Sequence, residues 1–145
     1  MNAADLKKFA LLSELSDEDR EALFELLEPK TLNKGRSIFR EGTEADGLVL
    51  VVSGTVIITG KRCPSTESVG PGAALGGLSL FVMGPREATA KVAKRCELLQ
   101  LPRTSYRRLV EDAPGTACRL TEAIAKQLTI CARDALDAVA VGISK

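Results

Sequence analysis

Histidine is absent from this chain of 145 residues, and so is tryptophan. Histidine is the commonest general base near neutral pH and the usual partner of serine or cysteine nucleophiles. The absence of histidine argues against an enzyme, and it excludes zinc sites that combine cysteine with histidine ligands. We therefore expect no enzymatic activity, no catalytic residues and no metal site.

Cysteine is scarce. The four cysteines, Cys63, Cys96, Cys118 and Cys131, include no C-x-x-C pair, which is the spacing of structural zinc sites and redox motifs. We interpret all four as structural thiols.

Long apolar runs are also missing. No stretch approaches the 18 consecutive apolar residues of a membrane-spanning helix, and the N-terminus carries Asp5 where a secretory signal has a basic start. We therefore expect a cytoplasmic protein that does not bind membranes.

Charge of one sign does not dominate. The 20 basic and 19 acidic residues give a net charge of +1, and only 3% of residues are aromatic. The basic cluster Arg103, Arg107 and Arg108 is followed by apolar Leu109 and Val110 and lacks aromatic partners for stacked bases. We interpret the cluster as a solvated helix face and expect no nucleic-acid partner.

What is present suits one domain spanning residues 1–145. The first 28 residues predict N-terminal helices, with Ser16 as an N-cap followed by three acidic residues. The second of these helices should run to about Leu27, because Pro29 closes it.

Residues 31–101 predict an antiparallel sandwich or barrel, because short β-rich runs alternate with glycines. The expected strands cover residues 37–40, 48–52, 55–59, 67–69, 88–92 and 97–101. Ser53-Gly54 is a tight-turn signal between two of them.

Residues 103–141 predict two further helices. Tyr106, Leu109 and Val110 define a short amphipathic one, and Pro114 suits the first position of a longer one that ends near Val141. The long helix carries an a/d-type stripe: Ala117, Leu120, Ile124, Leu128, Cys131, Ala135 and Ala138. This stripe can pack on the chain's own β core or form the seam of a homodimer, and we favour the homodimer.

The segment from residue 75 to residue 89 carries the strongest functional signal. Gly76 and Gly77 allow a close backbone approach, and a short helix beginning near Leu78 directs its first N–H groups at an anion. Arg86 adds a planar charged fork that suits two phosphate oxygens. The segment can therefore hold a phosphate group.

The order of these parts resembles the cyclic-nucleotide-binding domain superfamily of catabolite-activator-like effector domains and protein-kinase regulatory subunits. The similarity covers about residues 6–136, and its matching residues outside the segment 75–89 are Lys34-Gly35, Ile38, Glu41-Gly42, Asp46, Ser53-Gly54-Thr55-Val56 and Pro71-Gly72. The resemblance implies an α+β fold, an antiparallel β-barrel or jelly roll of about eight short strands with N-terminal helices and a long C-terminal helix.

In that family the segment matching residues 75–89 is the phosphate-binding cassette. The resemblance therefore implies that cAMP or cGMP is the ligand, with no separate cofactor. The ligand-binding residues that it implies are Gly76, Gly77, Leu78, Ser79, Arg86, Glu87 and Ala88.

Two of these residues depart from the family pattern. Gly77 replaces a glutamate that accepts the ribose 2′-hydroxyl, and losing such a hydrogen bond costs about 1.5–3 kcal/mol, or roughly ten- to a hundredfold in affinity. Glu87 replaces a small or hydroxyl residue, and a carboxylate about 6 Å from the phosphate would repel it by roughly 3 kcal/mol. Weak cyclic-nucleotide binding and no binding both stay open.

The family mechanism implies that a captured phosphate pulls the cassette inward and repositions the C-terminal helix, where Gln127 or Thr129 would contact the base. The alternative function is a degenerate fold that binds no nucleotide and acts as a protein interaction module. Only residues 142–145 follow the last helix, so we expect no DNA-binding domain.

Overall fold

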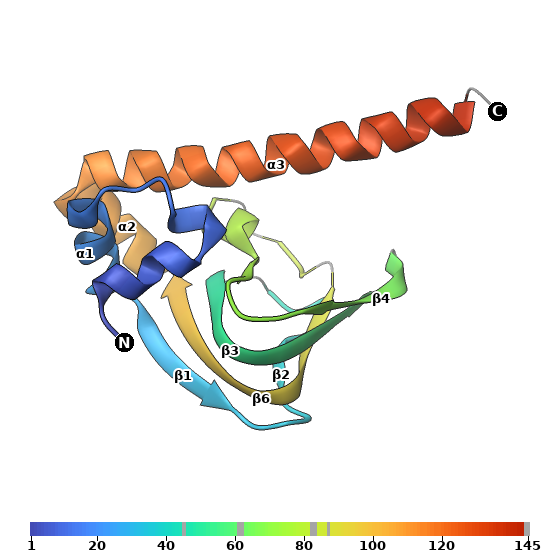
Figure 1. Cartoon of the computed structure of the whole chain (residues 1–145), viewed down its shortest axis with the longest axis horizontal. Helices are drawn as coiled ribbons and strands as arrows, with labels where there is room; N and C mark the ends of the chain where they lie inside the picture. The colour runs from blue at the N-terminus through green and yellow to red at the C-terminus, as the bar shows by residue number, and fades with distance from the viewer. Residues whose placement is uncertain (45, 61–62, 82–83, 87, 144–145) are drawn as a thin grey trace.

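The computed structural model describes residues 1–44, 46–60, 63–81, 84–86 and 88–143. Helices at both ends of the chain pack together on one side of a curved sheet (Figure 1). The helices are η1 (Ala3–Lys8), η2 (Ala10–Leu12), α1 (Asp17–Phe24), η3 (Gly77–Leu80), α2 (Arg103–Asp112) and α3 (Pro114–Ile143). The strands are β1 (Glu28–Leu32), β2 (Ser37–Phe39), β3 (Gly47–Gly60), β4 (Cys63–Val69), β5 (Ala74–Leu75) and β6 (Thr89–Pro102).

All six strands of the described chain form one antiparallel sheet. The strand order is β1-β6-β3-β4, while β2 also pairs with β6 and β5 with β3. The two central strands, β3 and β6, are 14 residues long and bend strongly, so that the sheet curls around an interior (Figure 1). The predicted α+β class, with N-terminal helices and a long C-terminal helix, is confirmed.

Each central strand was expected as two shorter ones, and that detail is wrong. Ser53-Gly54 is not a turn, because β3 continues through it with shifts in its pairing to β6. Gly54 has φ +95°, and a Cβ there would overlap the carbonyl oxygen of Arg95 on β6. The glycine therefore marks a bulge that bends the strand. Residues 88–92 and 97–101 likewise belong to the single strand β6, so the described chain has fewer strands than the expected eight.

The first strand, β1, was not among the strands expected from the sequence. Helix α1 ends at Phe24 instead of Leu27, and β1 runs from Glu28 through Pro29, which lies opposite Leu99 of β6. Proline is tolerated there because β1 lies at the end of the main strand order. Strand β5 is only two residues long, which is too short to produce an alternating pattern in the sequence.

The core has two parts. One lies between the helices and the sheet and includes Leu12, Leu23, Leu50 and Leu120, all fully buried. The other lies within the curl of the sheet: Val49, Val51, Val56, Ala90, Val92, Cys96 and Leu98. Burial at both places is the main favourable contribution to folding.

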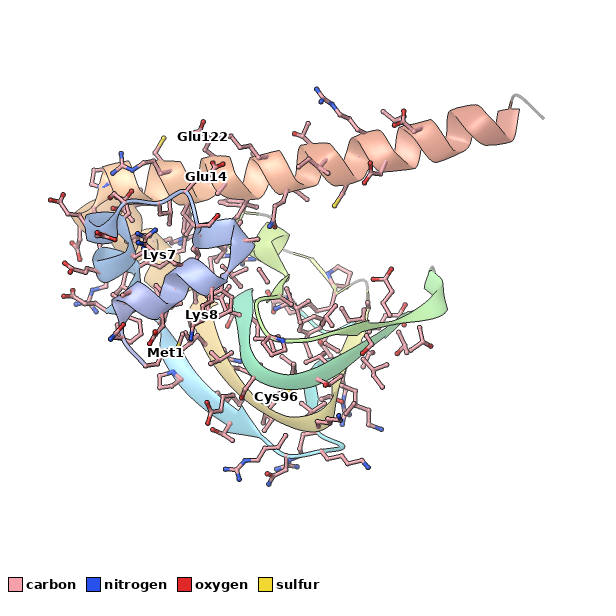
Figure 2. All side chains as sticks on the ribbon, in the orientation of Figure 1. Met1, Lys7, Lys8, Glu14, Cys96 and Glu122 are labelled. Atoms are coloured by element: carbon pink, nitrogen blue, oxygen red, sulfur yellow. The ribbon has the colours of Figure 1, made fainter. Side chains whose placement is uncertain are left out.

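The cysteines are divided between core and surface. Cys96, labelled in Figure 2, is buried, whereas Cys118 and Cys131 are free thiols exposed on α3. The side chain of Cys63 lies outside the described residues.

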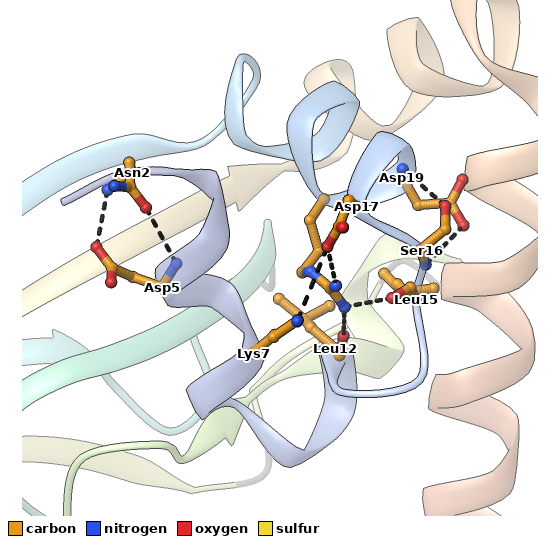
Figure 3. Close-up of polar contacts among 9 residues, drawn as sticks. Asn2, Asp5, Lys7, Leu12, Leu15, Ser16, Asp17 and Asp19 are labelled. Carbon is orange, nitrogen blue, oxygen red and sulfur yellow. Dashed lines mark hydrogen bonds and ion pairs between the residues drawn. The ribbon is translucent and has the colours of Figure 1, made fainter.

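The predicted N-cap of α1 also attaches the N-terminal helices to α3. Ser16 and Asp19 form a reciprocal capping box, drawn in Figure 3. The Asp19 carboxylate, only 2% exposed, accepts hydrogen bonds from Thr116 Oγ1 (2.6 Å) and from Arg119 Nε (2.5 Å) and Nη2 (2.6 Å). The Arg119 guanidinium holds the pKa of Asp19 well below its usual range, although burial of the carboxyl opposes this shift.

Helix α3 begins at Pro114 as predicted, and its apolar stripe changes character along its length. Ala117, Leu120 and Ile124 are buried against the domain, whereas Leu128 is 38% exposed and Cys131 is exposed. The C-terminal part of α3 extends away from the other helices (Figure 1). No helix in the described part of the chain has the length and hydropathy needed to cross a bilayer.

Candidate functional site

Arg86 is fixed through its backbone to the loop that follows β2. Its N–H donates to the carbonyl of Thr43 (2.7 Å), and its own carbonyl accepts from the N–H of Gly42 (2.9 Å). Nearby, the N–H of Glu41 donates to Thr89 Oγ1 (2.9 Å). The loop after β2 therefore helps to fix the position of Arg86, in addition to the cassette segment that carries it.

The Arg86 side chain points toward the sheet. Nη2 donates to the carbonyl of Gly47 at the start of β3 (3.1 Å), and Cζ lies 4.2 Å from the centre of the Phe39 ring. The ring face attracts the cation. Partial burial lowers the pKa of Arg86, and the charge of Asp46 opposes that shift. An arginine stays charged under such conditions.

Gly76 leaves the space that the guanidinium occupies. Its φ is +74°, and a Cβ at this position would overlap Arg86 Nη1 and lie 3.1 Å from the carbonyl oxygen of Gly47. Any other residue would have to displace the arginine and adopt a strained backbone. Gly76 and Arg86, which the sequence analysis named separately as candidate phosphate-binding residues, thus lie against each other.

Helix η3 begins at Gly77, the residue after Gly76. The first N–H groups of any helix have no partner within it, and they carry a partial positive charge. The start of η3 and the Arg86 guanidinium therefore both adjoin Gly76, and together they can hold an anion with two or more oxygens. In the part of the chain that the structure describes, no three Asp, Glu or Cys side chains gather as a metal site would require.

Gly77 differs from Gly76. Its φ lies outside the left-handed region, and a Cβ built there would be 3.3 Å from Cγ2 of Ile124, on α3. Ile124 is 4% exposed. Helix α3 therefore packs directly against the cassette, at the residue where a glutamate was expected from the family pattern.

A second set of contacts joins the cassette to α3 through α2. Phe81, which follows η3, meets Tyr106 of α2 edge to face, with ring centres 5.4 Å apart. The hydroxyl of Tyr106 lies 2.5 Å from Thr121 Oγ1 on α3. A shift of the cassette would thus act on α3 at two places, Ile124 and Thr121.

The remaining predicted site residues vary in how far the structure places them. Leu78 and Ser79 lie in η3, and Ala88 is half-buried just before β6, whereas Glu87 lies outside the described residues. Gln127 and Thr129 are both exposed on α3, and Thr129 Oγ1 donates to the carbonyl of Ala125 (2.9 Å).

Three residues of the site were missed by the sequence analysis. Phe39 and Gly47 hold the Arg86 side chain, and Ile124 covers Gly77. The sequence analysis had already singled out Asp46, so the glycine that follows it could have been recognised as part of the same motif. Nothing local to Phe39 or Ile124 indicates that either reaches the cassette.

Comparison with known proteins identifies this arrangement. The family model described as the cyclic nucleotide-binding domain matches residues 29–113. The chain belongs to the cyclic nucleotide-binding domain family. This is a family of regulatory domains, and the matched region runs from within β1 to the end of α2, so it contains the whole cassette.

Curated relatives include two kinds of regulator. A CRP-like cAMP-activated global transcriptional regulator of Mycobacterium tuberculosis is 30% identical over 112 residues, covering 74% of this chain and 50% of that protein. A cAMP-dependent protein kinase regulatory subunit of Eremothecium gossypii is 35% identical over 102 residues, covering 69% of this chain and 22% of that protein. The chain thus spans half the length of the first relative and less of the second.

Solved structures agree with the family assignment. The N-terminal domain of a transcriptional regulator from Streptomyces coelicolor A3(2) has a TM-score of 0.77 at 30% identity, covering 88% of this chain and 94% of that one. The catabolite activator protein of Thermus thermophilus has a TM-score of 0.74 at 28% identity, covering 90% of this chain and 62% of that one.

Proposed function

We propose that this chain is a regulatory domain that binds a cyclic nucleotide monophosphate, cAMP or cGMP, and signals through α3. The phosphate would be held by the backbone N–H groups of Leu78 and Ser79 and by the Arg86 guanidinium, with Gly76, Gly77, Glu87 and Ala88 completing the cassette. The M. tuberculosis relative is named as cAMP-activated, which supports the choice of ligand.

The contact between Gly76 and Arg86 carries this proposal. Arg86 is half-buried against Gly76, which no residue with a Cβ could replace without displacing the guanidinium, and its hydrogen bond to the neutral Gly47 carbonyl is weaker than a bond to phosphate. A phosphate would therefore compete well for the guanidinium. Drawing Arg86 from Gly47 toward the ligand would move the cassette, and the contacts at Ile124 and Tyr106 would pass that movement to α3.

We further propose that the chain is a homodimer through α3. Leu128 and Cys131 continue the face on which Ile124 is buried, at the i+4 and i+7 positions, yet both are exposed. A second copy of α3 would cover this face, as in a two-stranded coiled coil. In such a dimer, a ligand bound to one copy would affect the conformation of the second copy through the shared helices.

Calorimetric titration with cAMP and cGMP tests the ligand, using the intact chain, Arg86→Ala and Arg86→Lys. We expect saturable binding that Arg86→Ala abolishes and Arg86→Lys weakens, because lysine keeps the charge but not the two-pronged geometry. Circular dichroism would establish that each variant is folded. Flat traces at millimolar ligand with an intact fold would refute the proposal.

A second function, an interaction module that binds no nucleotide, is favoured by the packing of Ile124 on Gly77. There an apolar helix residue meets the cassette at the position where the family has its ribose-binding carboxylate. The same titration separates the two functions, since an interaction module would give no heat with either nucleotide.

A further inference from the structure

Phe39 is one of the four phenylalanines of the chain, and it is the last residue of strand β2. Strand β2 pairs with β6 in a ladder whose register shifts between Ser37 and Phe39, so that Phe39 lies opposite Ala90. A shift of this kind changes the direction in which a side chain points. The Phe39 side chain is half-buried and packs against the part of the core inside the curl of the sheet. The ring is therefore supported by the sheet and not by the cassette.

The Phe39 ring and the Gly47 carbonyl contact different parts of the Arg86 guanidinium. The N–H groups of an arginine all lie in the guanidinium plane, whereas an aromatic ring contacts the face of the cation. Arg86 Cζ lies 4.2 Å from the centre of the Phe39 ring, and Nη2 donates to the Gly47 carbonyl (3.1 Å). An anion can therefore replace the carbonyl at the edge of the guanidinium while the ring stays on its face.

A ring also differs from an acidic side chain as a support for an arginine. A carboxylate would bond to the N–H groups and compete with a phosphate for them, whereas a ring offers no oxygen. The charge of Asp46 favours the cationic form of Arg86, against the effect of burial on its pKa. The Phe39 ring favours the same cationic form without using any of its N–H groups.

We propose that Phe39 is a positioning residue for the phosphate, because its ring holds the Arg86 guanidinium in place before the nucleotide binds. When the nucleotide binds, Arg86 Nη2 exchanges the Gly47 carbonyl for a phosphate oxygen, and the ring contact is kept. An arginine that is already ordered loses less side-chain entropy on binding than a mobile one. The effect on nucleotide affinity rests on the proposed function, whereas the orientation of Arg86 by the ring does not.

Calorimetry with cAMP and cGMP tests the effect on affinity. Phe39→Leu should weaken binding about two- to tenfold, which is the cost of ordering one long side chain. Phe39→Tyr keeps the ring face and should bind like the unaltered chain. The matched control is Phe24→Leu, which should also bind unchanged, because Phe24 is half-buried at the end of α1 and packs with the helices. Unchanged or tighter binding by Phe39→Leu, or equal weakening in the two leucine variants, would overturn the proposal.

Nuclear magnetic resonance of the unliganded chain tests the orientation of Arg86 itself. Protons held over the face of an aromatic ring resonate upfield of their ordinary positions. The side-chain signals of Arg86, identified by their loss in Arg86→Lys, should therefore lie upfield in the unaltered chain, in Phe39→Tyr and in Phe24→Leu. They should return to ordinary positions in Phe39→Leu. Arg86 signals that are the same in Phe39→Leu and in the unaltered chain would refute the proposal.

The two measurements together separate the role of Phe39 from the proposed function. Upfield Arg86 signals in a chain that binds neither nucleotide would support the orientation of Arg86 by Phe39 and refute the proposed function alone. Ordinary Arg86 signals in a chain that binds a nucleotide would support the proposed function and refute the role of Phe39.

Discussion

Gly77→Glu is the most informative single change in the cassette. It restores the carboxylate expected from the family pattern, and the backbone permits it, because φ at Gly77 lies outside the left-handed region. The new Cβ would lie 3.3 Å from Ile124 Cγ2, which is tighter than ordinary contact. Ile124 would have to yield by a few tenths of an ångström.

The cost and the gain can both be estimated. Crowding of a packed side chain costs about 1–3 kcal/mol, and replacing a glycine in an allowed conformation returns about 0.4–1 kcal/mol. We therefore expect the free energy of unfolding to fall by about 1 kcal/mol. A carboxylate that accepts the ribose 2′-hydroxyl adds about 1.5–3 kcal/mol to binding, or roughly ten- to a hundredfold in affinity for cAMP.

Denaturant unfolding measures the first quantity, and calorimetry with cAMP and 2′-deoxy-cAMP measures the second. The gain should be large for cAMP and absent for the 2′-deoxy ligand, and Gly77→Gln should give a smaller gain for cAMP, since it offers an uncharged acceptor. A gain of equal size for both ligands would refute the reasoning, because the side chain at position 77 would then not face the ribose.

Three further predictions concern the glycine under Arg86, the Asp19 cluster and the dimer. Gly76→Ala should abolish nucleotide binding because its Cβ displaces the Arg86 guanidinium, whereas Gly35→Ala, also at positive φ but with no atom within 4 Å of its Cβ, should lose only stability. Calorimetry that finds both variants equally able to bind nucleotide would contradict this prediction. Asp19→Asn should lower the free energy of unfolding by about 1–2 kcal/mol near neutral pH, the lower part of the range for charged hydrogen bonds because Arg119 is 54% exposed. Folding lowers the pKa of Asp19, so the carboxylate stabilises the fold above the unfolded pKa of about 3.9, and this stabilisation is lost as the pH falls below that value. Urea unfolding at several pH values should therefore show that the stability of Asp19→Asn depends less on acid pH than that of the unaltered chain. An identical pH dependence in the two proteins would disprove the prediction. If the chain dimerises through α3, mild oxidation with diamide should cross-link two chains through Cys131, because Cys131 continues the helix face of Ile124, and not through Cys118. Cross-linking that is retained in Cys131→Ser and lost in Cys118→Ser would exclude this dimer.

The sequence predicted features that depend on near neighbours. The Ser16 cap, Pro114 at the start of α3 and the short helix at the cassette each follow from a few adjacent residues, and all three are present. The fold class followed from the order of such features along the chain.

Features set by distant packing could not be predicted in this way. Ser53-Gly54 reads equally as a turn or a bulge, and only the carbonyl of Arg95 on the neighbouring strand decides between them. The contacts of Arg86 with Phe39 and of Gly77 with Ile124 join residues 47 apart in the chain. The apolar stripe of α3 likewise did not indicate that its residues are buried by the domain as far as Ile124 and exposed from Leu128 onward.

The most direct test of the central claim is a crystal structure of the chain grown with millimolar cAMP or cGMP. The account predicts a phosphate between the backbone N–H groups at the start of η3 and the guanidinium of Arg86, with Arg86 Nη2 drawn away from the Gly47 carbonyl that it now contacts at 3.1 Å. A structure in which no nucleotide is bound there and Arg86 still contacts Gly47 and Phe39 would contradict it.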